Sequence, residues 1–329
     1  MDVKGKTIAI TGAGGFVGLH MVQRCHERGM IVRGLDSSTG AVESARNAGA
    51  DMIQGDVCNP EDAQKLCAGA DVVFHAAAIV REGGDYALFE KVNVGGTRTI
   101  ASAATAAGVK RFIQVSSVMV YGFHYPENVA EDGPLCGEGN AYCQTKIESE
   151  QVAMGFHNPG AMEIIAMRCG DIYGPRSIPW TVRPIQMMRQ NLFMYANGGS
   201  GIINHVYIDN ILDAVFLALE KDVTGESFNV TDGQRTTFKQ FFGRYATMLG
   251  KWWLPSLPAF LLKPVINVSN VVRKVFGKPP LVTADFIPYV TRKHCYSIEK
   301  SRRMLGYEPR VDLEEGMRRI ADWLKTQPL

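Results

Sequence analysis

Residues 8–18 read Ile-Ala-Ile-Thr-Gly-Ala-Gly-Gly-Phe-Val-Gly, and this stretch predicts a strand, a glycine turn and a helix in succession. The apolar, β-rich run 7–10 enters a turn that carries Gly12, Gly15 and Gly18, and a helical pattern of apolar residues leaves it. Glycines let a backbone approach a pyrophosphate closely, and the N-terminus of a helix directs unpaired N–H groups at the negative charge. The stretch therefore favours a dinucleotide-binding turn, and a tight βα turn without a ligand is the alternative.

A carboxylate follows at the spacing that such a turn requires. The next apolar run, residues 30–35, ends in Asp36, about as far downstream as a dinucleotide-binding fold places the carboxylate that binds the adenosine ribose. Strand and helix signals then keep alternating, with helices expected at 41–48, 60–67 and 86–107 and strands at 71–75 and 110–116. This alternation predicts an α/β fold, a doubly wound parallel sheet of the Rossmann type with helices on both faces.

Two further features are expected at the carboxyl edge of this sheet. Asp56 follows a short strand, where it is placed either to bind an adenine amino group or to cap the helix that begins near Pro60. Residues 75–78 read His-Ala-Ala-Ala, and small side chains there leave room for the sugar and phosphate of a cofactor.

Composition excludes several classes of protein. The chain has 329 residues, of which 46% are hydrophobic, and its formal net charge of +2 is too mild to indicate nucleic-acid binding. The N-terminal residues run into the first strand without the apolar region of a signal peptide, so we expect a cytoplasmic protein. Seven scattered cysteines without a Cys-x-x-Cys pair suggest neither a disulfide framework nor a metal site.

A second group of residues carries acid–base chemistry. The fifth strand ends at Ser116 and Ser117, and a predicted helix then places Tyr142 and Lys146 four residues apart on one face. A nearby ammonium would lower the pKa of the tyrosine toward working pH and make it a usable proton donor or acceptor, while a serine hydroxyl holds the substrate oxygen. The chain has the same spacing at Tyr289 and Lys293, but no strand with serines precedes that pair, and we interpret it as chance.

Taken together and in this order, these motifs resemble the extended short-chain dehydrogenase/reductase superfamily, of the epimerase/dehydratase type. The resemblance continues through residues 168–175, 205–210 and 305–309 and so covers nearly the whole chain. Within the superfamily the chain is most similar to the 3β-hydroxysteroid dehydrogenase-like group.

The resemblance implies roles for individual residues. Tyr142 would be the general acid/base, Lys146 would bind the nicotinamide ribose and tune Tyr142, and Ser117 would orient the reacting oxygen. Asn93 lies in the family's Asn-x-x-Gly-Thr segment, or alternatively bonds the backbone of the adjacent strand. Asp36 favours NAD over NADP, because a carboxylate repels a 2′-phosphate. The full set of cofactor-binding residues that the resemblance implies is Gly12, Gly15, Phe16, Val17, Gly18, Asp36, Asp56, Val57, Ala76, Ala78, Asn93, Tyr142, Lys146, Cys169 and Ile172.

The substrate class is less strongly indicated than the cofactor. Nucleotide-sugar members of the superfamily usually carry an asparagine two residues before the tyrosine of the Tyr-Gly-Pro stretch, whereas this chain has Asp171, whose carboxylate would face a diphosphate unfavourably unless neutralised. We therefore expect an NAD-dependent dehydrogenase of a secondary alcohol on an apolar substrate, either 3β-hydroxysteroid-like or a β-hydroxy acid. The alternatives are a nucleotide-sugar epimerase or dehydratase with tightly bound NAD, and a non-catalytic dinucleotide sensor.

Residues 252–278 form an unusually apolar segment with cations at its end. Four interruptions, at Pro255, Pro258, Lys263 and Pro264, make it too broken for a transmembrane helix, which needs about 20 continuous apolar residues. It is expected to line an apolar substrate pocket or to contact a membrane surface peripherally, and the alternative is a buried helical hairpin in the core of the smaller lobe.

The chain is expected to interleave two lobes. Residues 1–175 would form the NAD-binding domain, to which 205–233 return, while 176–204 and 234–329 would mainly build a smaller substrate-binding lobe. The loops 81–84 and 123–125 are expected over the same edge of the sheet. Helices 86–107 and 140–155 form the usual homodimer bundle in this superfamily, although their apolar stripes are also open to burial within one monomer.

Overall fold

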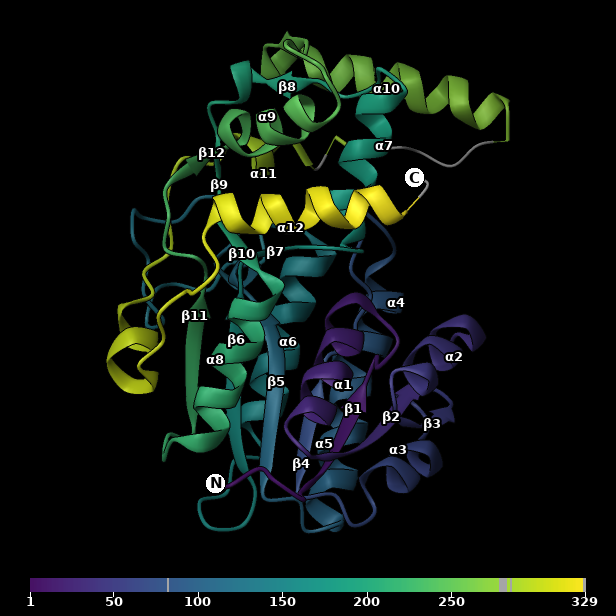
Figure 1. The fold of residues 1–329 in the computed structure, drawn as a ribbon, viewed down its shortest axis with the longest axis vertical. Coiled ribbons are helices and arrows are strands. Elements are labelled where there is room, and N and C mark those ends of the chain that lie inside the picture. The colour runs from purple at the N-terminus through teal and green to yellow at the C-terminus, as the bar shows by residue number, and fades with distance from the viewer. Residues whose placement is uncertain (82, 278–282, 285, 328–329) are drawn as a thin grey trace.

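The computed structural model describes residues 1–81, 83–277, 283–284 and 286–327. Its centre is a seven-stranded sheet with strand order β11-β6-β5-β4-β1-β2-β3, in which every neighbouring pair is parallel (Figure 1). The strands are β1 (Thr7–Thr11), β2 (Ile31–Asp36), β3 (Asp51–Gln54), β4 (Val72–His75), β5 (Arg111–Ser117), β6 (Glu163–Cys169) and β11 (Glu226–Val230). The order reverses between β1 and β4, and parallel sheets bind ligands in the crevice outside such a reversal. The predicted fold class is confirmed.

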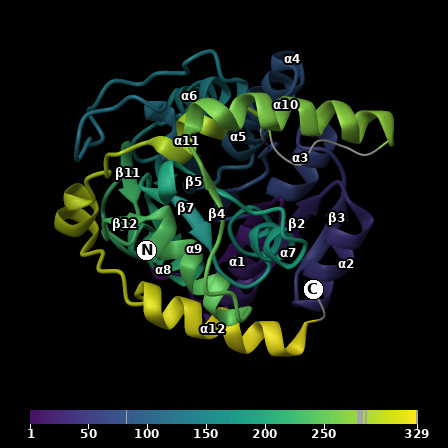
Figure 2. The same ribbon diagram turned by 90° about the horizontal axis from the view of Figure 1, so that it is seen from above.

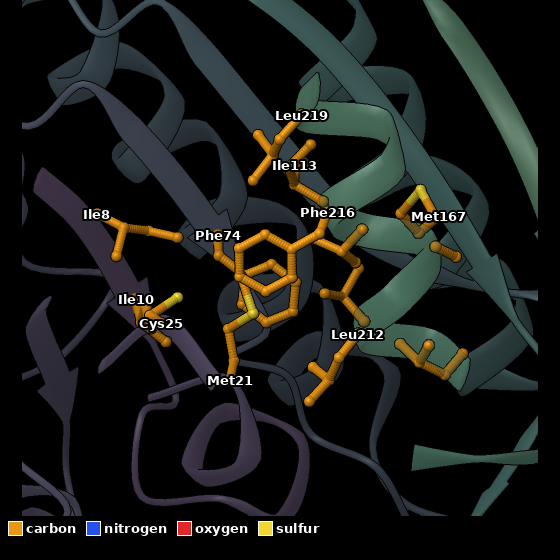
Figure 3. Packing of buried hydrophobic residues seen from close by; sticks show 14 of the residues in the cluster. Ile8, Ile10, Met21, Cys25, Phe74, Ile113, Met167, Leu212, Phe216 and Leu219 are labelled. Atoms are coloured by element: carbon orange, nitrogen blue, oxygen red, sulfur yellow. The ribbon is translucent and has the colours of Figure 1, made fainter. Parts of the chain in front are cut away.

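Helices cover both faces of the sheet. The first face is covered by α1 (Phe16–Glu27), α2 (Thr39–Asn47) and α8 (Ile208–Glu220), and the second by α3 (Pro60–Cys67), α5 (Gly96–Ala106) and α6 (Ala141–Met154). Figure 3 shows the core under the first face, where Met21 of α1 and Phe216 of α8 pack against Phe74 of β4. Both layers are apolar on their sheet-facing side, as a doubly wound fold requires.

The helix expected over 86–107 contains a π-helical turn. It runs as α4 (Tyr86–Phe89), a π-helical segment Glu90–Gly95 and α5, without a break in the chain. Single π turns inside α-helices occur often at functional sites. This one contains Asn93, one of the expected cofactor-binding residues, and buries its side chain.

The remaining elements lie mostly above the carboxyl edge of the sheet (Figure 1). They are β7 (Asp171–Tyr173), a π-helical turn Ile178–Val182, α7 (Arg183–Arg189), β8 (Tyr195–Ala196), a 3₁₀ turn Asn197–Gly199, β9 (Ile202–Ile203), β10 (His205–Tyr207), β12 (Thr236–Thr237), α9 (Phe238–Met248), β13 (Ser256–Leu257), α10 (Ala259–Val275), α11 (Phe286–Thr291), a π-helical turn Ser301–Leu305 and α12 (Leu313–Thr326); a 3₁₀ turn Val118–Tyr121 follows β5. An aromatic cluster that includes Phe238, Phe241 and Tyr245 forms their core. The chain then returns to the large sheet, since Ile298, Leu305 and Tyr307 belong to the core under its first face.

Helix α10 is not a core element. Of its residues only Leu262 is buried, and Figure 2 shows the helix along the periphery of the molecule, on the side opposite α12. The alternative of a buried helical hairpin over 252–278 is therefore wrong for the described part, while residue 278 lies outside the described residues. No helix in the described ranges is long and apolar enough to cross a bilayer.

A buried ion pair joins α6 to the sheet. Arg168 of β6 donates to Glu150 of α6 at 2.7 Å, and both side chains are 6% exposed. Ser116 of β5 and Ser227 of β11 also donate to this carboxylate, and Arg168 donates to the Tyr121 hydroxyl at 2.6 Å. The network thus holds one helix and three strands in one register.

We expect Arg168→Met to lower the free energy of unfolding by about 3 kcal/mol, because it leaves the buried Glu150 carboxylate without its cation. Replacing both partners with methionine should recover part of this loss, since an apolar pair needs no desolvation of charge. The exposed Arg318→Met on α12 is the control and should leave the urea midpoint nearly unchanged. Equal midpoints for Arg168→Met and Arg318→Met would contradict a structural role for the network.

Candidate active site

The glycine turn between β1 and α1 leaves no room for side chains. Gly12 has a φ of +64°, and a Cβ there would lie 3.1 Å from the backbone of Ala77. A Cβ on Gly18 would lie 2.0 Å from the carbonyl oxygen of Gly12. The N-cap residue of α1, Gly15, supplies no side-chain bond, and the first turn of the helix carries no acidic residue. Unsatisfied N–H groups and close backbone access together fit a bound pyrophosphate.

The two acidic residues at strand ends differ in their bonding. Asp36 is the last residue of β2, and its carboxylate accepts from the backbone N–H of Gly14 at 3.1 Å, so it lies directly beside the glycine turn. Asp56 accepts from the N–H of Cys58 at 2.9 Å, and the side chain that caps α3 belongs to Asn59. The alternative of a helix cap at Asp56 was therefore wrong.

A buried hydrogen-bond chain fixes the end of β4. Thr11 of β1 bonds the His75 ring at 2.8 Å, and its hydroxyl also accepts from the N–H groups of Ala76 and Ala77. Burial lowers the pKa of His75 to about 3, so this imidazole is neutral at working pH. His75 therefore has a structural part here, holding the small residues that follow β4 next to the glycine turn.

Asn93 uses its amide to hold a loop. Its oxygen accepts from the N–H of Ile79 at 2.8 Å, and its nitrogen donates to the Thr145 hydroxyl at 3.1 Å. It therefore bonds the backbone just beyond β4 and ties it to α6. A direct contact between Asn93 and the cofactor stays a prediction.

The expected acid–base residues converge at the carboxyl end of β5. Asn140 caps α6 by accepting from the N–H groups of Tyr142 and Cys143, which fixes where the helix starts. Lys146 lies one turn further on; its Nζ is 6.0 Å from the centre of the Tyr142 ring and donates to the carbonyl oxygen of Val115 at 2.9 Å. Ser117 ends β5, and its hydroxyl accepts from the N–H of Met119.

The pKa values in this structure differ from the expectation that Lys146 lowers the pKa of Tyr142. Burial raises the pKa of Tyr142 above its ordinary value, and a hydrogen bond with Ser117 opposes that rise. Burial also lowers the pKa of Lys146 to about 8, against the opposing effects of Cys169 and Glu150. The physical reason is that desolvation, the largest cause for each group, disfavours the charged form of both.

The other expected cofactor-binding residues lie around the same edge. Phe16 and Val17 open α1, Val57 follows β3 and contacts Gly96 of α5, and Ala78 follows β4. Cys169 ends β6 and Ile172 lies in β7. All seven cysteines are free, and among the described residues no group of three or more His, Cys, Asp and Glu side chains is placed to hold a metal.

A cavity of about 510 Å³ opens beside Tyr142. Its lining residues are Gly83, Gly84, Tyr86, Phe89, Phe123, Glu138, Gly139, Asn140, Ala141, Tyr142, Gln144 and Pro288, none of which is a lysine or an arginine. Residue 82 of the loop 81–84 lies outside the described residues. Although burial opposes it, hydrogen bonds from the backbone of Phe123 and His124 lower the pKa of the Glu138 carboxyl. The one carboxylate among the described lining residues is therefore ionised.

Asp171 does not face this cavity as a free carboxylate. It is buried in β7 and forms an ion pair with Arg292, and the hydroxyl of Tyr289 donates to it. Asp171 would therefore not repel a diphosphate as a free carboxylate, because Arg292 neutralises its charge. The sequence reasoning missed both partners, and it treated Tyr289 as part of a chance spacing.

Tyr289 brings an aromatic wall to the site. Its ring stacks on those of Trp180 and Phe286, with ring centres 5.5 Å and 5.3 Å away, and meets Phe123 edge-on. Phe123 and the neighbouring Pro288 both line the cavity beside Tyr142. Segments far apart in the sequence therefore supply one apolar side of the cavity.

Comparison with known proteins places the chain in a family. Residues 8–231 match the model of the NAD dependent epimerase/dehydratase family, and the chain belongs to that family. It is 28% identical to the mouse (Mus musculus) "sterol-4-alpha-carboxylate 3-dehydrogenase, decarboxylating", with 96% of this chain and 90% of the relative aligned. It is also 28% identical to the "2-alkyl-3-oxoalkanoate reductase" of Stenotrophomonas maltophilia, over 95% and 98% of the two chains.

A solved structure shows the same fold. The UDP-glucose 4-epimerase of Thermotoga maritima, crystallised with UDP-glucose, aligns with a TM-score of 0.80 at 24% identity over 97% of this chain and 99% of its own. The predicted resemblance to extended short-chain dehydrogenases with 3β-hydroxysteroid dehydrogenase-like members is confirmed. The protein is an NAD-dependent oxidoreductase, and NAD is its cofactor.

We expect Asp36→Ser to change the choice of dinucleotide. Loss of a charged hydrogen-bond acceptor should raise the Kd for NADH about tenfold, and removal of the repulsion should lower the Kd for NADPH. The fluorescence of each bound dinucleotide measures both constants. Asp51→Ser, at the exposed start of β3, is the control; an unchanged ratio of the two constants in Asp36→Ser would exclude the ribose contact.

Dinucleotide affinity should also depend on pH through Lys146. In the free protein the pKa of Lys146 is about 8, and only its ammonium form can donate to ribose hydroxyls with full charge. The Kd for NADH should therefore rise as pH increases through about 8. In Lys146→Met the Kd should be higher throughout and flat over this range; a pH dependence that survives in the variant would assign the titration to another group.

Proposed function

We propose that the protein transfers a hydride between NAD and a secondary alcohol or ketone on an apolar substrate, either 3β-hydroxysteroid-like or a β-hydroxy acid. The observation that carries this proposal is the cavity beside Tyr142. Among the described residues, its lining has aromatic rings, glycines and an ionised carboxylate but neither lysine nor arginine. A nucleotide sugar would bring a diphosphate to that lining without a cation to receive it, whereas a 3β-hydroxysteroid is neutral and a β-hydroxy acid brings a single negative charge.

The names of two relatives support the same substrate class. One is named as a dehydrogenase of a sterol carboxylate and the other as a reductase of a 2-alkyl-3-oxoalkanoate. Each name describes an apolar molecule with an oxygen at position 3 and a carboxylate nearby. The similarity of both proteins to nearly the whole of this chain favours a related substrate here.

Different residues of the chain would move the proton, hold the reacting oxygen and bind the cofactor. NAD supplies the nicotinamide carbon that accepts or donates the hydride. Tyr142 takes the proton from the alcohol or returns it to the ketone, and Ser117 holds the reacting oxygen by a hydrogen bond. Lys146 would bind the ribose hydroxyls and bring positive charge near Tyr142. The expected binding residues from Gly12 to Ile172 would hold the rest of the dinucleotide.

A nucleotide-sugar epimerase or dehydratase with tightly bound NAD is the second candidate. The ion pair between Asp171 and Arg292 favours it, because it removes the electrostatic objection to a diphosphate near β7. Retention of NAD through purification and a rise in Tm with a UDP-sugar would support this candidate.

The proposal extends to the organisation of the protein. Residues 1–175 and 205–233 would hold NAD, and 176–204 with most of 234–329 would hold the substrate. A homodimer through helices 86–107 and 140–155, and a cytoplasmic location, stay predictions from the sequence.

The test is NADH formation at 340 nm with NAD and a panel of 3β-hydroxysteroids, long-chain 3-hydroxy acids and simple secondary alcohols. We expect turnover on an apolar alcohol, and a loss of at least about a hundredfold in kcat for Tyr142→Phe with little change in NADH binding, because only the proton-transfer group is removed. Tyr86→Phe, at the rim of the same cavity, is the matched control. No turnover across the panel, together with a UDP-sugar-induced rise in Tm, would overturn the proposal.

A further inference from the structure

Large apolar side chains are exposed along a single segment that the catalytic site does not use. Trp252 is 95% exposed and Val275 is 77% exposed. The segment 252–276 holds most of the large exposed hydrophobic residues of the described chain: Trp252, Trp253, Phe260, Leu261, Val265, Val268, Val271, Val272, Val275 and Phe276. A soluble monomer rarely exposes so many apolar side chains in one place unless they have a function.

Helix α10 sorts its residues into three faces. Leu262 is buried and Ile266 is half-buried, and this face packs on the rest of the protein. Leu261, Val265, Val268, Val272 and Val275 follow the three- and four-residue spacing of one helical stripe and are all exposed. Lys263, Asn267 and Lys274 form a polar stripe beside it. The polar stripe flanks an apolar surface that points to solvent.

The charge of the segment has one sign. Residues 251–277 contain no aspartate or glutamate and carry the cations Lys251, Lys263, Arg273 and Lys274, although the whole chain has a formal net charge of only +2. Two adjacent tryptophans precede the helix, and tryptophan favours the boundary between hydrocarbon and water. An apolar stripe with flanking cations and interfacial tryptophans is complementary to a bilayer surface that contains anionic lipid.

A second copy of this chain fits the segment less well. A two-fold pairing of α10 with its copy would place two segments of the same positive charge side by side. The segment has no carboxylate to offset that repulsion. Charge therefore favours anionic lipid as the occupant.

The position of α10 connects this surface to the cavity. The helix contacts α11, and α11 carries Pro288, which lines the cavity beside Tyr142. We propose that Trp252, Trp253 and the apolar stripe of α10 insert into the interfacial layer of an anionic bilayer and set the substrate cavity close to the lipid surface. Docking rests on the segment 252–276 alone; the entry of an apolar substrate from the bilayer rests in addition on the proposed function.

Vesicle flotation of the full-length protein tests docking without any substrate. We expect the protein to float with phosphatidylcholine vesicles that contain phosphatidylglycerol, and less with phosphatidylcholine alone. Val268→Asp with Val272→Asp should lower the affinity at least tenfold, because two apolar anchors are replaced by charges. Lys263→Gln and Lys274→Gln should each lower it about fivefold for anionic vesicles only. Ile31→Asp, an exposed apolar position on β2, is the control and should float like the wild type.

Other results would overturn the proposal. These are no flotation of the wild type with anionic vesicles, equal flotation of the Val268/Val272 variant, or a dimer in sedimentation velocity that only this variant disrupts. The test is independent of the chemistry. Flotation without turnover of apolar alcohols would support docking and contradict the proposed function. Turnover without flotation would support the proposed function and contradict docking. Turnover of a short water-soluble alcohol by the α10 variants should equal that of the wild type.

Discussion

The buried ion pair between Glu150 and Arg168 is the constraint on which the position of the catalytic groups depends. Tyr142, Lys146 and Glu150 follow each other at four-residue spacing on α6, so all three face the sheet. Because Glu150 is bonded to β5, β6 and β11 at once, the helix cannot slide or rotate without breaking several buried bonds. This fixes Lys146, about one turn away, and Tyr142, about two turns away, against the end of β5.

The smaller lobe is joined to the same centre by a second buried ion pair. Asp171 lies just beyond β6, and Arg292 and Tyr289 reach it from the segment that follows α10. This contact brings the aromatic stack of Tyr289 and Trp180 over the carboxyl edge of the sheet. One pair thus sets the proton-transfer groups, and the other sets an apolar wall near them.

The sequence predicted the parts of this protein that depend on local pattern. Glycine spacing, strand and helix alternation and the Tyr142–Lys146 spacing all follow from neighbouring residues, and the structure has the sheet and the helix that they require. The four-residue spacing also predicts that Glu150 lies on the same helix face as Tyr142 and Lys146. It does not predict that Glu150 is buried, because its partner Arg168 lies on another element. Arg292 is 121 residues from Asp171, so nothing local indicated that it neutralises that carboxylate. The exposure of α10 could not be predicted either, because an apolar run has the same sequence pattern in a core and on a surface.

In the proposed function, Tyr142 serves hydride transfer from an apolar secondary alcohol. The most direct test of this role follows deuterium by NMR, using an apolar alcohol of the panel labelled with deuterium at the carbinol carbon, together with unlabelled NAD. We predict that the deuterium appears at C4 of the reduced nicotinamide, and that Tyr142→Phe slows its transfer at least about a hundredfold. Transfer at the same rate in Tyr142→Phe would contradict the role of Tyr142 in proton transfer. If no apolar alcohol transfers deuterium while a UDP-sugar exchanges hydride with bound NAD, the proposed substrate class is contradicted.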